Sequence, residues 1–378
     1  MPWRETSTMS LRVEFVELAR QEGANVRELC RRYGISPTTG YKWLARHAAA
    51  GPAGLADRSR RPRASPARTP AAVEAAVLAL RDAHPAWGPR KLHRRLRDLG
   101  EAGVPSTSAI GAILRRHGRI DPAEAAKHRP WQRFEHAAPN ALWQVDFKGP
   151  VPLAAGHAHP LSVLDDHSRF LVGLAACGDE RGATVREALT GVFRRCGLPE
   201  RLLFDNGPAW KGDWDEPLAP LVVWLLRLGV AVSHGRPGHP QTQGKVERFH
   251  RTLEAELLRR HRCPDLAAAQ ARLDAWRHTY NHERPHEALE LATPASRYRA
   301  SPRPFPEALP PPEYAPGELV RKVGAKGEVW LGGTPHRVGR ALVGLPVALR
   351  PTPEDGVYAV CLGGHRVATL DRRGQAAP

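Results

Sequence analysis

The chain has 378 residues, enough for two or three domains at about 150 residues each, and its 56 Lys+Arg against 39 Asp+Glu give a formal net charge of +17. This excess points to a polyanionic partner, most often nucleic acid, and the 42% hydrophobic content argues against a mostly disordered chain. No apolar run reaches the roughly 18 residues of a membrane span, no secretory signal is recognisable, and five scattered cysteines support neither a disulfide framework nor a zinc ribbon. We therefore expect a cytoplasmic protein with no membrane partner.

The positive charge is concentrated in the first third of the chain. Residues 1–139 hold 25 Lys+Arg and 13 Asp+Glu, residues 140–300 hold 21 and 19, and residues 301–378 hold 10 and 7. The excess is therefore +12 in the first segment and only +2 in the second. Contacts with nucleic acid are expected mainly in the first segment.

Residues 1–50 are predicted to form a helix-turn-helix DNA-binding domain of three short helices. Ser36 is a good N-cap and is followed by proline, which favours a helix start after a tight turn. The helix expected over residues 38–47 would enter the major groove, so Lys42 and Arg46 are candidate DNA-binding residues. The alternative is a small three-helix unit that does not bind DNA.

A basic linker and a second helical domain are predicted next. Residues 51–69 are rich in Pro, Ala and Arg, and their arginines suit phosphate contacts, although a solvated linker is an equal alternative. Residues 70–120 repeat the three-helix pattern and are interpreted as a second helix-turn-helix or winged-helix domain. Arg94 and Arg95 are its candidate DNA-binding residues.

The pattern then changes to strands alternating with helices, which predicts an α/β core over residues 138–300. The expected order is three antiparallel strands, then helix, strand, helix, strand and a long helix, at residues 142–148, 161–164, 170–176, 184–196, 201–205, 221–228, 230–233 and 243–260. This order suggests a ribonuclease-H-type domain. Seven prolines mark residues 301–316 as a linker, and short apolar runs broken by Gly and Pro predict a small C-terminal β-barrel over residues 317–374.

Three acids stand out within the predicted α/β core. The apolar neighbours of Asp146 would face the core of the domain, so its carboxylate projects from the other face of its strand. Asp205 ends a later strand, at the edge where sites form in α/β sheets, and Glu247 lies in the first turns of the long helix. Clustered carboxylates repel one another unless a cation joins them. Mg²⁺ prefers such oxygen ligands together with substrate phosphate, although acids at these places are also often ordinary caps or surface groups.

Four segments carry a resemblance to a known family. Residues 143–147 (WQVDF), 202–210 (LLFDNGPAW) and 233–254 (SHGRPGHPQTQGKVERFHRTLE) are similar to the integrase-type DDE catalytic core of bacterial insertion-sequence transposases, within the retroviral integrase superfamily. Residues 280–289 (YNHERPHEAL) resemble the segment that usually follows. The chain departs from the family in one spacing, because the 41 residues between the second acid and the glutamate exceed the usual number.

The resemblance implies a site and a set of ligands. It places the catalytic triad, which would also be the metal ligands, at Asp146, Asp205 and Glu247. It implies a ribonuclease-H-like fold and Mg²⁺ or Mn²⁺, with two ions as in other phosphodiester-cleaving centres. Near Glu247, Gln243 is a candidate contact to DNA phosphates or bases. Lys245, Arg248 and Arg251 are candidate phosphate contacts, with a solvated basic helix face as their alternative. Asp165 and Asp166 are interpreted as turn caps rather than metal ligands.

The function implied is metal-dependent DNA strand cleavage and strand transfer by a transposase. Its partners would be double-stranded DNA, as element ends and target, and further copies of the chain in a homo-oligomer. One alternative is a domesticated, non-catalytic DNA-binding regulator, and another is a nuclease that cuts DNA without joining it.

Overall fold

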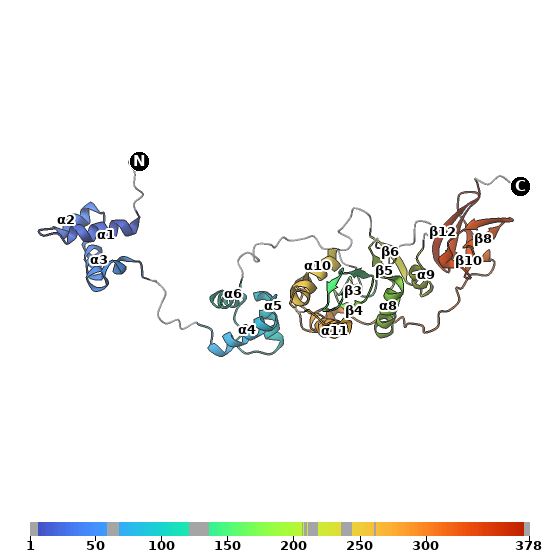
Figure 1. Ribbon diagram of the computed structural model, residues 1–378, viewed down its shortest axis with the longest axis horizontal. Coiled ribbons are helices and arrows are strands. Elements are labelled where there is room, and N and C mark those ends of the chain that lie inside the picture. The colour runs from blue at the N-terminus through green and yellow to red at the C-terminus, as the bar shows by residue number, and fades with distance from the viewer. Residues whose placement is uncertain are drawn as a thin grey trace. The chain divides into compact units, whose positions relative to one another are not determined.

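The computed structural model describes most of the chain, and every structural statement below concerns these residues: 7–58, 68–120, 136–205, 207, 210, 218–235, 244–260 and 262–373. The chain divides into two compact units, Met1–Arg68 and Thr69–Pro378. Figure 1 labels most of their helices and strands. No helix in the described ranges has the length and apolarity to span a membrane.

The first unit is a three-helix domain. It contains α1 (Thr8–Ala19), α2 (Val26–Arg32), α3 (Pro37–Ala50) and a short 3-10 turn at Gly51–Leu55. Ser36 accepts a hydrogen bond from the Thr39 amide, and Pro37 occupies the first helical turn, which confirms the predicted helix start. Five buried side chains form its core: Phe15, Val16, Cys30, Trp43 and Leu55.

The second unit begins with another three-helix domain, made of α4 (Ala71–Ala83), α5 (Pro89–Asp98) and α6 (Thr107–Arg116). Ser106 caps α6 by accepting from the Ala109 amide. The three helices enclose a core of their own around Trp87, which is almost fully buried. The two three-helix patterns predicted from the sequence are therefore both observed.

A six-stranded mixed sheet forms the centre of the second unit. Its strands are β1 (Trp143–Phe147), β2 (Val151–Pro152), β3 (His157–Asp165), β4 (Leu171–Cys177), β5 (Arg201–Phe204) and β6 (Ala231–His234). The order is β2-β3-β1-β5-β6, and β4 also pairs with β3. β3 runs antiparallel to β1, β2 and β4, whereas β5 is parallel to β1 and to β6. The short β2 was not predicted from the sequence.

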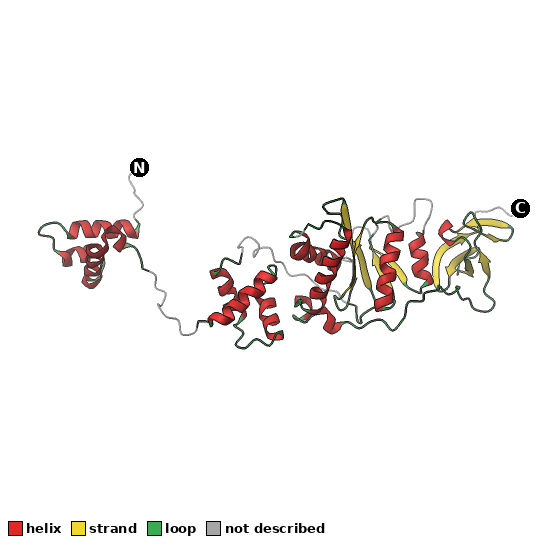
Figure 2. Cartoon of the chain, turned by 60° about the horizontal axis from the view of Figure 1, so that its bottom comes forward, coloured by secondary structure: helices red, strands yellow, loops and turns green. Residues whose placement is uncertain are grey.

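Helices cover both faces of this sheet, as Figures 1 and 2 show. One face packs against α8 (Gly182–Cys196) and α9 (Pro220–Arg227), with Trp143 and Val145 in the buried cluster. The other face packs against α10 (Gly244–Leu253) and α11 (Leu266–His282), around Leu164 of β3. The alternation predicted for β1 is therefore confirmed, because its odd-numbered residues face α8 and α9.

The long helix predicted over residues 243–260 differs from the observed one. The α-helical part ends at Leu253, and a π-helical turn occupies Glu254–Leu258. Glu256, within this π turn, makes an ion pair with Arg284, a residue beyond the end of α11. Two 3-10 turns follow α11, at Glu287–Leu289 and Pro294–Arg297.

The C-terminal region consists of antiparallel strands, as predicted. β7 (Val320–Lys322), β10 (Pro346–Pro351), β11 (Val357–Leu362) and β12 (His365–Asp371) form a sheet in the order β12-β11-β10-β7. β8 (Glu328–Leu331) and β9 (Thr334–Arg337) form a separate hairpin, and a 3-10 turn lies at Arg340–Leu342. The four-stranded sheet and the hairpin are separate sheets, and their side chains pack into one buried core.

Candidate active site

Asp146 lies on the face of β1 that α10 covers. Its neighbour Val145 is fully buried on the opposite face, and Asp146 pairs in register with Ser162 of β3. The Asp146 side chain is 17% exposed to solvent. A carboxylate in this position has a strand on each side and little water to solvate its charge.

Asp205 follows the last residue of β5, next to β1 in the sheet. Its Oδ1 accepts hydrogen bonds from the Gly207 amide at 2.9 Å and from the Trp210 indole Nε1 at 2.5 Å. The buried Trp210 ring stacks on Phe204 and Phe147, with centroids 4.7 and 5.8 Å away. The indole therefore fixes the Asp205 carboxylate at the carboxyl end of two parallel strands, where α/β sheets place their sites.

Glu247 is exposed in the first turn of α10. Val246, Phe249 and Leu253 of the same helix are buried against the sheet, in the cluster that contains Leu164. Side chains spaced by three and four residues share a helix face, so this packing fixes the rotation of α10. Glu247 therefore lies beside the buried stripe, as the sequence predicted.

Electrostatics connect the three acids. Burial raises the pKa of Asp146 to about 7, and the negative charges of Asp205 and then Glu247 add to this rise. Glu180 contributes a smaller effect in the same direction. The fold therefore brings Asp205 and Glu247 within electrostatic reach of Asp146, although no three His, Cys, Asp or Glu side chains of the described ranges are close enough to form a complete metal site.

A serine and a histidine that the sequence analysis did not select contact Asp146. The Ser162 hydroxyl donates to the Asp146 carbonyl oxygen at 2.9 Å, and it lies 2.7 Å from His250 Nε2. His250 Nδ1 lies 3.7 Å from Asp146 Oδ2. Burial, and then the charge of Lys148, lower the pKa of His250 to about 4, so its ring is neutral at physiological pH. The only sequence signal was its place one helical turn after Glu247.

The predicted DNA-binding residues have different surroundings. In the first unit, Lys42 and Arg46 lie over the Trp43 ring, at 4.7 and 5.0 Å from its centroid. Arg94 pairs with Asp98 at 2.8 Å and Arg95 with Glu283 at 2.6 Å. Arg248 and Arg251 are exposed on α10, Lys245 contacts Asp166 at 2.5 Å, and Gln243 lies outside the described residues.

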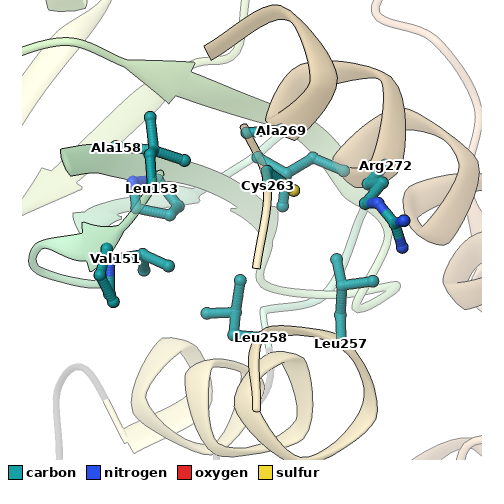
Figure 3. Close-up of a pocket in the computed structure, with 11 residues that line it drawn as sticks. Val151, Leu153, Ala158, Leu257, Leu258, Cys263, Ala269 and Arg272 are labelled. Carbon is teal, nitrogen blue, oxygen red and sulfur yellow. The ribbon is translucent and has the colours of Figure 1, made fainter. Parts of the chain in front are cut away.

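The structure also contains a separate pocket (Figure 3). Its lining is apolar apart from Arg272, and it includes Leu153, Leu257, Leu258 and Cys263. None of the three acids lines it. Because it offers no carboxylate, we do not assign it to the candidate site.

Known protein families match most of the chain. Residues 136–240 and 228–294 match integrase core domain models, and residues 318–378 match the C-terminal domain of IS481 family transposases. By these matches the chain is similar to insertion-sequence transposases with an integrase core. Residues 11–63 match a helix-turn-helix domain model, and residues 39–114 match a homeodomain-like domain model.

Two relatives come from bacterial insertion elements. An uncharacterized 31.7 kDa protein of insertion element IS407 from Burkholderia multivorans is 30% identical over 43% of this chain and 58% of its own length. An uncharacterized 39.2 kDa protein of insertion element IS476 from Xanthomonas euvesicatoria is 28% identical over 62% of this chain and 67% of its own length. The chain thus spans 58% and 67% of the lengths of these two relatives.

Solved integrase structures are more distant. The HTLV-2 integrase catalytic core domain in complex with magnesium is 17% identical, with a TM-score of 0.34, over 43% of this chain and 99% of the other. A simian T-cell lymphotropic virus intasome in complex with a PP2A regulatory subunit is 16% identical, with a TM-score of 0.38, over 78% of this chain and 94% of the other.

Proposed function

We propose that the chain catalyses metal-dependent cleavage of DNA strands and their transfer to a target, with Asp146, Asp205 and Glu247 as catalytic residues. The observation that carries this proposal is the placement of the acids, with Asp146 on β1, Asp205 at the end of the adjacent parallel β5 and Glu247 on α10, which packs on the same face as Asp146. The raised pKa of Asp146, to which the charges of Asp205 and Glu247 contribute, supports it. Three acids from a strand, a strand end and a helix are an unfavourable arrangement without a cation. Perturbed pKa values cluster at functional sites, where like charges are brought together.

The chemistry of the three acids fits a hard divalent ion. All three offer only carboxylate oxygens, which Mg²⁺ and Mn²⁺ accept. Bound there, one or two such ions would supply Lewis-acid activation of the attacking oxygen and stabilise the leaving oxygen of a phosphodiester. Asp146 and Asp205 would hold the ion from the sheet, and Glu247 from the helix.

The neighbouring residues would prepare these acids for the ion. Trp210 and Gly207 hold Asp205 by hydrogen bonds to one oxygen, which leaves Oδ2 for a ligand. His250 is neutral beside Asp146 and so adds no positive charge that would compete with a metal ion. Ser162 joins both residues and fixes their spacing.

The proposal assigns roles to the other parts of the chain. Residues 1–50 and 70–120 would bind the element ends as double-stranded DNA, with 51–69 as a basic linker. Residues 138–300 would form a ribonuclease-H-like catalytic core, which the sheet order β2-β3-β1-β5-β6 supports. Residues 317–374 would close as a small barrel beyond the linker 301–316. Two DNA ends held together imply a homo-oligomer.

The test compares the intact chain with Asp146→Asn and Glu247→Gln. Each change removes one charge with little change of shape, so we expect cleavage and strand transfer to fall by at least about a hundredfold, because the site then has one metal ligand fewer. Binding of end-containing DNA should persist. The measurements are a Mg²⁺-dependent cleavage and joining assay on duplexes with the element ends, and anisotropy for binding.

Three outcomes separate this proposal from its alternatives. A wild-type chain that binds the ends but never cuts them would instead be a regulator. A chain that cuts but does not join would be a nuclease. A Glu247→Gln variant with full activity would remove Glu247 from the site.

A further inference from the structure

The turn after β3 contains a buried carboxylate that the proposed chemistry does not use. Asp166 is 2% exposed, and its Oδ1 accepts from the Gln144 side-chain amide at 2.8 Å. Its Oδ2 accepts from the His136 amide at 2.9 Å and lies 2.5 Å from the Lys245 ammonium. Lys245 Nζ also donates to the Asp166 carbonyl oxygen at 3.3 Å.

The two side-chain partners of Asp166 lie next to the proposed active site. Gln144 precedes Asp146 by two residues on the same face of β1, and Lys245 precedes Glu247 by two residues on α10. One carboxylate therefore connects the strand that carries the first acid to the helix that carries the third. The short separation in each element means that a movement of either partner would displace the acid beside it.

We propose that Asp166 and Lys245 are positioning residues, which together fix the start of α10 and so place Glu247 opposite Asp146. This inference rests on the proposed function, because it requires Glu247 to be a metal ligand. It also replaces the prediction that Lys245 contacts DNA phosphate. Lys245 makes its ion pair within the protein, with Asp166. Arg248 on the same helix remains a candidate for phosphate contact.

The charge balance of the site supports this assignment. The Lys245 side chain is 18% exposed and that of Asp166 is 3% exposed, so the pair lies largely outside bulk water. Removing one member of such a pair leaves an unpaired buried charge, which is far more costly than breaking an exposed ion pair. Turning Lys245 outward to a phosphate would impose the same cost on Asp166.

The test uses the full chain with four changes: Lys245→Gln, Asp166→Asn, the double variant, and Arg248→Gln as the matched control from the exposed face of α10. For Lys245→Gln we expect cleavage to fall about tenfold and the Mg²⁺ concentration for half-maximal cleavage to rise about tenfold, as for other residues that hold metal ligands. Hydrogen exchange of the amides over 244–253 should become faster. Affinity for end DNA and its salt dependence should stay as in the wild type.

The control and the double variant should behave differently. Arg248→Gln should weaken DNA binding and reduce the salt dependence by about one phosphate contact, with hydrogen exchange in α10 unchanged. The double variant removes both buried charges together, so its α10 exchange rates should return towards the wild type. If Lys245→Gln does not fold, the same measurements of hydrogen exchange, Mg²⁺ dependence and DNA affinity are made on the double variant and on the charge-preserving Lys245→Arg.

Two results would overturn the proposal. In the first, Lys245→Gln lowers DNA affinity and salt dependence as Arg248→Gln does, without faster exchange in α10, and Lys245 is then a phosphate contact. In the second, none of the measured quantities changes. A wild-type chain without Mg²⁺-dependent cleavage would instead contradict the proposed function, while the hydrogen-exchange comparison would still report on the Asp166–Lys245 pair.

Discussion

The protonation of Asp146 follows from where β1 places it. The residue lies between two strands and beneath α10, with His250 and Ser162 as polar neighbours. Its pKa of about 7 exceeds the ordinary 3.8, so the folded chain binds a proton that the unfolded chain releases. The stabilising contribution of this proton is complete below about pH 4, and it is lost as the pH rises through 7.

This linkage predicts the effect of Asp146→Asn on stability. The variant keeps the shape and has no charge to bury, so its free energy of unfolding should exceed that of the wild type more at pH 8 than at pH 5. One pKa unit corresponds to about 1.4 kcal/mol, which makes the difference roughly a few kcal/mol. Urea denaturation in EDTA at both pH values measures it. As a control, Asp274→Asn on the exposed face of α11 should change the free energy of unfolding by the same amount at both pH values. An equal change at both pH values for Asp146→Asn would refute the linkage.

At the residue scale, the sequence predicted the acids and missed their neighbours. The alternation of β1 was sufficient to predict the face from which Asp146 projects, because the period of a strand is two. Ser162, His250 and Asp166 were missed as neighbours of the acids because their roles depend on pairing between β1, β3 and α10. A single sequence contains no signal for a contact between residues about 90 positions apart, such as that between Ser162 and His250.

At the element scale, the π turn after α10 shows where periodicity is insufficient. The apolar spacing predicted one helix to residue 260, but Glu256 in the turn pairs with Arg284 at 2.9 Å. Both side chains are nearly buried, at 10% and 7% exposure, and Arg284 also lies over the Tyr280 ring. A helix that widens by one residue can aim a side chain at a distant partner, and local spacing does not show that partner.

The same reasoning explains the short strands. β2 has two residues and β9 includes Pro335, so neither offers the alternation from which strands are predicted. Each is defined by its pairing, β2 with the longer β3 and β9 with β8, a strand of the same length. The longer core strands were predicted to within a few residues because their apolar runs are buried on both faces of the sheet.

The Glu256–Arg284 pair gives a prediction for stability. Glu256→Gln leaves the Arg284 charge buried without its partner, which should lower the free energy of unfolding by about 3 kcal/mol. The exposed Arg194–Glu307 pair provides the control, and Glu307→Gln should cost less than about 1 kcal/mol. Urea denaturation of the metal-free chain compares them. Equal losses for both variants would show that the buried pair has no special role.

At the scale of the whole molecule, the charge is divided unequally between the two units. Residues 1–68 hold 13 Lys+Arg and 6 Asp+Glu, an excess of +7 in less than a fifth of the chain. Residues 140–300 are nearly neutral, because 19 Asp+Glu offset their 21 Lys+Arg. Three of those acids are the proposed metal ligands. Affinity for DNA and catalysis should therefore be separable, with the first unit contributing mainly to affinity.

This separation predicts the behaviour of a chain that begins at Thr69, the first residue of the second unit. The slope of log K against log salt should decrease by about 0.9 for every phosphate that the first unit neutralises, so four such phosphates correspond to a decrease of about 3.6. Anisotropy with end-containing duplexes over 50–200 mM salt measures the slope. The full chain with Lys42→Gln and Arg46→Gln should neutralise up to two phosphates fewer than the wild type, as an intermediate case. Strand cleavage by the shortened chain at saturating DNA should persist, because the three proposed catalytic acids all lie in the second unit. An unchanged slope in the shortened chain would mean that the first unit does not bind phosphate.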